Sequence, residues 1–164
     1  MHPSAKHNFS LFLEMVPPDQ SFLEIGSYNV NGGLKDIITN CKSYTGLDQF
    51  EGPGVDVVSN PEDPLPFEDN AFDVVYSSSC FEHDTAFWLT FKEMVRVLRP
   101  GGLLYICAPS QGSYHAHPVD CWRFLKDSWA ALEKTCPDIK LVKSYICDLD
   151  PEWHDSIGIY EKTI

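Results

Sequence analysis

The chain has 164 residues, with 12 basic and 24 acidic side chains and a formal net charge of −12. This length suits one hydrophobic core, and the acidic excess disfavours a nucleic-acid partner, which would need a basic face. No run of 18 apolar residues or signal-peptide pattern is present, so we expect a cytoplasmic protein without a membrane span. The six cysteines avoid C-x-x-C spacing, which favours reduced thiols over a zinc or redox site.

Apolar periodicity predicts strands that alternate with helices, within one domain spanning residues 1–164. The expected strands are 21–25, 43–48, 55–59, 72–77, 103–108, 141–146 and 158–161. The expected helices are 4–15, 32–40, one that Asp84 caps and Pro100-Gly101-Gly102 stops, and 127–134. Residues 109–126 have no regular pattern, and a long irregular loop that carries aromatic and ionisable side chains indicates a functional segment.

Two of the expected strands end in a carboxylate. Glu24 closes the first, just before Gly26, and Asp48 closes the second, 24 positions later. A strand, a glycine turn and a second acid-tipped strand form a nucleoside-binding unit in which the tip acid accepts ribose hydroxyls. Tyr28 stands where a dinucleotide fold has its second glycine and would crowd a pyrophosphate. The pattern therefore favours S-adenosylmethionine (SAM) over NAD.

Six motifs occur in one order along residues 22–108. They are Leu23-Glu24-Ile25-Gly26-Ser27, Gly46-Leu47-Asp48, Leu65-Pro66-Phe67, Phe72-Asp73-Val74-Val75, Phe81-Glu82-His83 and Val97-Leu98-Arg99-Pro100-Gly101-Gly102. As an ordered set they resemble the class I SAM-dependent methyltransferases of the methyltransferase 11 type. The resemblance implies an α/β, Rossmann-like fold. Its seven-stranded sheet would be mostly parallel, with the last strand antiparallel and helices on both faces.

The resemblance also implies where the cofactor binds. Its contacts would be Glu24, Gly26 and Ser27 in the first loop, Asp48 at the ribose, Asn60 at the adenine, and Ser77 and Ser78 on the methionine side. The chain departs from the family at Tyr28 and at Asn60, where many members have a glycine and an aspartate. An asparagine can still accept a hydrogen bond from the adenine amino group.

The irregular loop supplies the catalytic candidates. His117 is the first choice as general base, with His115 as the alternative and Asp120 as the supporting carboxylate. The His115-x-His117 spacing also suits a metal site. Because Pro118 interrupts the segment and no further ligand is evident, we expect no metal.

These patterns predict an enzyme that transfers a methyl group from SAM to a small-molecule or glycan-like acceptor. The alternative is a non-catalytic SAM-fold subunit that binds or regulates another methyltransferase. A nucleotide-sugar or NAD enzyme is a weaker alternative, which the glycine pattern opposes. The short N-terminal extension before the first strand would leave the site open, or closed by a homodimer.

Overall fold

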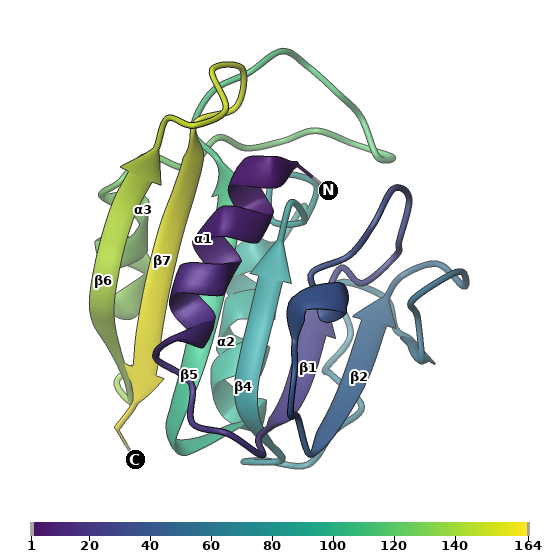
Figure 1. Cartoon of the computed structure of the whole chain (residues 1–164), viewed down its shortest axis with the longest axis vertical. Helices are drawn as coiled ribbons and strands as arrows, with labels where there is room; N and C mark the ends of the chain where they lie inside the picture. Colours follow the sequence, from purple (N-terminus) through teal and green to yellow (C-terminus); the bar gives the residue numbers. More distant parts are fainter. Residues whose placement is uncertain (1, 164) are drawn as a thin grey trace.

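A computed structural model describes residues 2–163, and all seven strands lie in one sheet of order β3-β2-β1-β4-β5-β7-β6 (Figure 1). The strands are β1 (Ser21–Ile25), β2 (Ser43–Asp48), β3 (Val57–Val58), β4 (Phe72–Ser78), β5 (Leu98–Pro109), β6 (Ile139–Cys147) and β7 (Asp155–Lys162). β7 is antiparallel to both of its neighbours, β5 and β6, whereas the pairs from β3 to β5 are parallel. The fold predicted from the sequence is therefore confirmed.

Helices cover both faces of the sheet. Helix α1 (Pro3–Leu13) crosses the face seen in Figure 1, and the short 3-10 helix η1 (Lys35–Ile37) lies near β1 and β2. Helices α2 (Phe87–Val97) and α3 (Ser128–Glu133) lie behind the sheet in the same view. Each helical layer buries its own group of apolar side chains, because the sheet is apolar on both faces.

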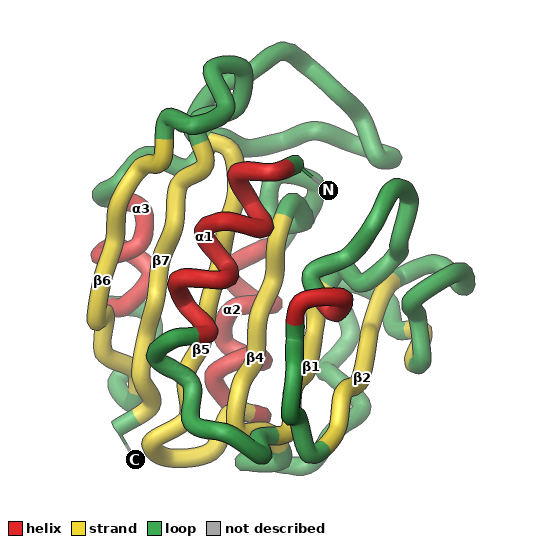
Figure 2. Tube along the Cα trace, in the orientation of Figure 1, coloured by secondary structure: helices red, strands yellow, loops and turns green. Residues whose placement is uncertain are grey.

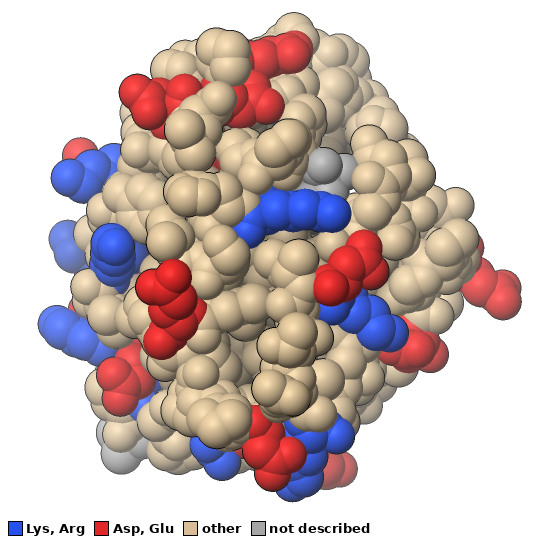
Figure 3. All heavy atoms as spheres, viewed as in Figure 1, with Lys and Arg blue, Asp and Glu red and all other residues tan. Residues whose placement is uncertain are grey.

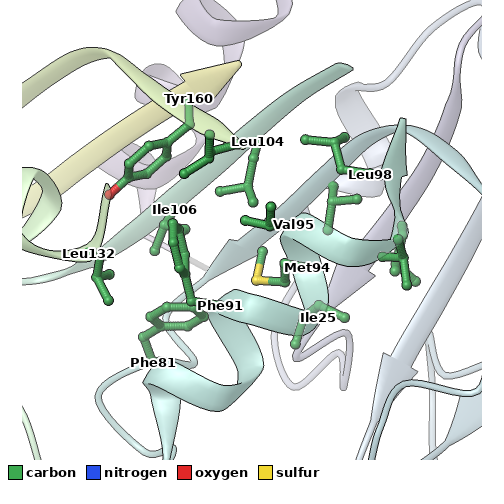
Figure 4. Close-up of a cluster of buried hydrophobic side chains, with 14 of the residues drawn as sticks. Ile25, Phe81, Phe91, Met94, Val95, Leu98, Leu104, Ile106, Leu132 and Tyr160 are labelled. Atoms are coloured by element: carbon green, nitrogen blue, oxygen red, sulfur yellow. The ribbon is translucent and has the colours of Figure 1, made fainter. Parts of the chain in front are cut away.

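The core is correspondingly double. On the α2 face, Phe91, Met94 and Val95 project from the helix toward side chains of the sheet such as Ile106 (Figure 4). On the α1 face, Phe9 packs against Tyr76 and Tyr105, with ring centroids 4.6 and 5.3 Å apart. Packing on both faces therefore fixes the position of the sheet's carboxyl edge relative to the helices.

The helix expected over residues 32–40 is wrong, because only η1 forms there. Gly32 has φ of +98°, which no right-handed helix contains. The Asn29 side chain accepts the Gly32 backbone N–H at 2.7 Å, and the segment ends at Asn40, whose φ is +59°. Polar side chains thus hold the backbone in turns, and too few residues remain to nucleate a helix.

Asp84 is also not the N-cap of α2, which begins at Phe87 after Ala86. The Asp84 carboxylate accepts the Ala86 backbone N–H at 2.8 Å and the Thr90 hydroxyl, so it holds the turn that precedes the helix. At the other end, β5 starts at Leu98. The Pro100-Gly101-Gly102 segment, which we expected to stop the helix and precede the next strand, therefore lies within β5.

The sheet has a topological switch at β1, which pairs with β2 on one side and with β4 on the other. Ligands of open α/β sheets bind at the carboxyl edge beside such a switch. Residues 110–127 form neither helix nor strand, as predicted, and arch over this edge of the sheet (Figure 2).

On the face viewed in Figure 3, basic and acidic side chains are interspersed.

Phe9 provides a test of the α1 layer. Phe9→Ala removes a fully buried ring and should lower the free energy of unfolding by about 3–5 kcal/mol, measured by urea denaturation. Leu11→Ala on the same helix is the control, because Leu11 is exposed and should change stability little. Equal losses in the two variants would contradict the packing described here.

Candidate functional site

Two cavities open at the carboxyl edge of the sheet, of about 650 and 430 Å³. Both cavities are lined by Gly26, Asp48, Gln49, Cys80, His83 and Pro118. They therefore meet beside the switch point, where the loops after β1, β2 and β4 converge. An extended ligand could occupy both cavities and contact the shared residues at its middle.

Gly26 allows these loops to come together. Its φ is +82°, and a Cβ placed on it would lie 2.6 Å from both Cβ and Sγ of Cys80. Any other residue would collide with the β4 loop and strain its own backbone. The β1 loop therefore presents bare backbone to both cavities at this point.

Asp48 projects from the end of β2 and lines both cavities. One carboxylate oxygen accepts the Tyr28 backbone N–H and the other accepts the Phe50 backbone N–H, each at 3.1 Å. These bonds orient the carboxylate and leave lone pairs for further donors. The Tyr28 ring packs beside Gly52, where a Cβ would lie 2.2 Å from a ring carbon.

The smaller cavity combines apolar walls with the side-chain amides of Gln49 and Asn60. Ile25, Leu47, Leu65 and Leu89 line it, together with Asn60. The Asn60 side-chain nitrogen donates to Asp63 at 2.8 Å, which leaves its carbonyl oxygen as an acceptor. A flat, largely apolar ring with an exocyclic amino group matches this lining.

In the larger cavity, Ser78 is the polar group next to the strand end. Its hydroxyl is buried and finds no nitrogen or oxygen partner among residues 2–163. Its neighbour for hydrogen bonding is the Cys107 thiol, a weak partner, so a ligand that supplies a stronger polar group at this position would be stabilised.

Three residues expected at the cofactor, Glu24, Ser27 and Ser77, line neither cavity. The Glu24 carboxylate accepts hydrogen bonds from the hydroxyls of Tyr76, at 2.9 Å, and Tyr44. Burial raises the pKa of Glu24 above its ordinary value. Ser27 and Ser77 are buried behind the cavity walls. Gly26, Asp48, Asn60 and Ser78 are thus the expected cofactor residues that the fold brings to the cavities.

The predicted catalytic loop is held in place by an internal ion pair. Arg123 donates to both oxygens of Asp120, at 2.6 and 2.8 Å, and this pairing holds the pKa of the Asp120 carboxyl well below its usual range. Asp120 also accepts the His115 backbone N–H at 2.8 Å and lies 3.3 Å from His115 Nδ1. The Asp120 carboxylate therefore supports His115. His117 lines the larger cavity, and within the described residues Asp120 makes no hydrogen bond to it.

Backbone hydrogen bonds join this loop to the segment after β4. The Glu82 carbonyl accepts the N–H groups of Cys121 and Trp122, at 2.7 and 3.2 Å, and Trp122 Nε1 donates to the Asp84 carbonyl at 2.8 Å. His83 Nδ1 lies 2.7 Å from the Val119 carbonyl. Two segments about 38 residues apart are therefore one wall of the larger cavity.

This wall gathers three histidines. The His83 ring centroid lies 4.9 Å from that of His115 and 5.6 Å from that of His117. Burial lowers the pKa of His83, and burial raises the pKa of the neighbouring Glu82 to about 8. Glu82 and His83 were not selected from the sequence, although the Phe81-Glu82-His83 motif marked their position.

A further part of the cavity lining comes from the C-terminal part of the chain. Trp153 packs on His115 with ring centroids 4.4 Å apart, and both line the larger cavity with Asp155. Asp155 is buried, which raises its pKa, and its carboxylate faces Asn8 Nδ2 at 3.5 Å. No local sequence signal identified these residues, because the long-range β5–β7 pairing brings them to the site.

Comparison with known proteins points to a methyltransferase. A family model described as "Methyltransferase domain" matches residues 34–106. The structure of a 1,6-didemethyltoxoflavin-N1-methyltransferase from Burkholderia thailandensis, with bound S-adenosylhomocysteine, superimposes with a TM-score of 0.73 at 18% identity, covering 99% of this chain and 78% of that one. Over residues 34–106 the chain is therefore similar to a methyltransferase domain, and its fold is that of the class I SAM-dependent methyltransferases.

Curated relatives match only in part. A phthiotriol/phenolphthiotriol dimycocerosates methyltransferase from Mycobacterium ulcerans is 43% identical over 76 residues, covering 38% of this chain and 27% of the relative. A 2-methyl-6-phytyl-1,4-hydroquinone methyltransferase from Synechocystis is 25% identical over 88% of this chain and 55% of the relative. The matched region is therefore about a quarter to a half of these relatives. Within the described residues, none of the helices has the length and apolar character that a membrane crossing requires.

The raised pKa of Glu24 predicts a pH effect on stability. A carboxyl that binds its proton more tightly in the folded state stabilises the fold below its unfolded pKa, near 4.5, and that contribution is lost as the pH rises through the folded value. Urea denaturation from pH 4.5 upward to 8.5 should therefore show wild type losing stability relative to Glu24→Gln, which cannot ionise. Parallel profiles for the two proteins would contradict this account of the Glu24 environment.

Proposed function

We propose that this chain is an enzyme that transfers a methyl group from SAM to a hydroxyl-bearing small-molecule or glycan-like acceptor. The observation that carries the proposal is the meeting of two cavities at Gly26 and Asp48. The smaller cavity suits an adenine, and the larger one has room for a methionine moiety and an acceptor. The similarity to methyltransferases, one of which is solved with bound S-adenosylhomocysteine, supports the same cofactor.

The residues on the cavity walls fit SAM. Asp48 presents carboxylate oxygens suited to the ribose hydroxyls, and Asn60 offers a carbonyl suited to the adenine amino group. Gly26 lets the loops after β1 and β4 meet beside the cavities, and the Ser78 hydroxyl, which has no nitrogen or oxygen partner among residues 2–163, suits the polar amino-acid tail. Glu24, Ser27 and Ser77 would act from behind, by fixing the strand ends that carry these groups.

SAM supplies a sulfonium methyl group that is already activated for transfer, so the protein mainly aligns the acceptor and excludes water. His117 would accept the proton of the acceptor hydroxyl through a ring nitrogen while the oxygen bonds to the methyl carbon. The carbon–sulfur bond breaks in the same event, and its electron pair stays on sulfur. Asp120 would contribute indirectly, by holding His115 and the loop.

The character of the larger cavity supports the acceptor class. Its walls combine the aromatic rings of Tyr28, Phe50 and Trp153 with His115 and His117. Aromatic faces and imidazole nitrogens together suit a ring or sugar that carries hydroxyl groups. The relatives' names include a hydroquinone and a phthiotriol, both of which carry hydroxyl groups.

The alternative is a non-catalytic subunit that binds SAM and assists another methyltransferase. Tyr28 in place of the second glycine is the observation that favours it, since its ring lies at the edge of the larger cavity. Saturable SAM binding without turnover of any hydroxyl, amine or sugar acceptor would support this reading. The cytoplasmic location, the homodimer, the single domain and the absence of a nucleic-acid partner stay predictions.

Calorimetry with purified protein tests the cofactor. SAM and S-adenosylhomocysteine should bind with saturation, whereas NAD should not, because Tyr28 crowds the position of a pyrophosphate. Asp48→Ala should weaken SAM binding by about 1.5–3 kcal/mol for each ribose bond lost, with the fold retained. Asp127→Ala is the matched control, since this exposed aspartate lies away from both cavities. Tight NAD binding without SAM binding would refute the proposal.

The base is tested with an acceptor identified by S-adenosylhomocysteine release. His117→Ala should leave SAM affinity nearly unchanged and slow methyl transfer by about 10²–10⁴-fold. A parallel loss of thermal stability would instead indicate a packing role for His117. Turnover at the wild-type rate would show that another group, or solvent, accepts the proton.

A further inference from the structure

We propose that Glu82, His83 and His115 form a binding site for one divalent transition-metal ion, such as Zn²⁺, in the wall of the larger cavity. From the sequence alone we expect no metal, because no third ligand is evident near His115 and His117. The fold supplies two such groups from the segment after β4. The site goes beyond the proposed methyl transfer, which needs no metal.

The donor atoms are close enough to share an ion. One ligand atom from each of the three residues lies within 4.8 Å of the others, and Glu82 Oε1 lies 3.6 Å from His83 Nε2. Tetrahedral zinc sites with bonds of about 2.0–2.1 Å place neighbouring ligand atoms about 3.4 Å apart. The Glu82–His83 separation is already close to this value, and the three donor atoms would draw together around a bound ion.

The histidines are also oriented as metal ligands usually are. His83 Nδ1 donates to the Val119 carbonyl at 2.7 Å, which directs the Nε2 lone pair toward Glu82. His115 Nδ1 has two acceptors nearby, the Ser113 carbonyl at 3.1 Å and an Asp120 oxygen at 3.3 Å. Ligating histidines commonly give their second ring N–H to a carbonyl or carboxylate in this way.

Arg123 does not change which ring nitrogen of His115 carries the proton. Its Nη2 is a donor 3.5 Å from His115 Nδ1, and it is farther from that nitrogen than both acceptors are. That nitrogen already donates to Asp120 at 2.8 Å and to Ser113 at 2.9 Å. His115 Nε2 is therefore left with a lone pair.

Glu82 gives an independent reason for a cation. Its side chain is 2% exposed, and its Oε2 has no hydrogen-bond partner among the described residues. The 3.6 Å separation of Oε1 from His83 is too long for a hydrogen bond. The carboxylate has a hydrogen bond from its own backbone N–H and feels the charge of Arg123, but a buried carboxylate with one oxygen unpartnered among the described residues is still costly, and a coordinated cation would compensate it.

Two histidines and one carboxylate are also the ligand set of many catalytic zinc sites, which keep an open position. His83, Glu82 and His115 all line the larger cavity, so an ion there would be reached by a cavity ligand. If the proposed methyl transfer holds, the open position would receive the acceptor oxygen. A metal ion lowers the pKa of such an oxygen and would ease proton loss to His117.

Titration of the chelator-treated protein with Co²⁺ tests the site in the absence of SAM and acceptor. We expect saturation at one ion per chain and visible absorption bands of nitrogen and oxygen ligation, with Zn²⁺ displacing the bound Co²⁺. Absence of saturable binding, or bands dominated by cysteine sulfur, would overturn the proposal. Since no cofactor is present, the result is independent of whether the chain transfers methyl groups.

Variants then locate the bound ion. His115→Ala and His83→Ala should each weaken Co²⁺ binding by at least about 10–100-fold, the range that even supporting residues of metal sites produce. His7→Ala on the exposed side of α1 is the control and should bind as wild type does. Glu82→Gln tests the carboxylate, and His115→Ala, in the loop, decides the matter if Glu82→Gln does not fold. Unchanged affinity in folded His115→Ala would refute the site.

Discussion

The site depends on one close approach, between Gly26 at the end of β1 and Cys80 in the loop after β4. No side chain fits between them, and the positive φ of Gly26 turns the chain away from the sheet there. This contact sets the segment that carries Glu82 and His83 beside the β1 loop. Hydrogen bonds from the Glu82 carbonyl then fix the irregular loop above it. Both cavities follow from this arrangement.

The protein covers its open α/β sheet with few helices. Between β1 and β2 it has only η1, and α1 covers much of that face instead. The rings of Phe9 and Phe12 against Tyr76 and Tyr105 supply the apolar contact that a longer crossover helix would otherwise provide. The sheet edge can therefore stay accessible while the core beneath it stays packed.

Local patterns determined how far the sequence could be interpreted. The strands around Glu24 and Asp48 were predictable because apolar runs and their terminal acids lie within a few residues. The helix predicted at 32–40 does not form, because the hydrogen bond from the Gly32 N–H to the Asn29 side chain and the positive φ of Gly32 outweigh an apolar face. The grouping of His83 with His115 was not predictable, since it depends on the contact of His83 with Val119, 36 residues away.

The central claim is that the two cavities together hold one extended cofactor across the β1 switch point. A crystal structure of the chain with S-adenosylhomocysteine tests it most directly. The account predicts ribose hydroxyls on Asp48, adenine in the cavity beside Asn60, and the thioether sulfur in the larger cavity facing His117. A ligand bound outside these cavities, or one that leaves Asp48 without contact, would contradict it.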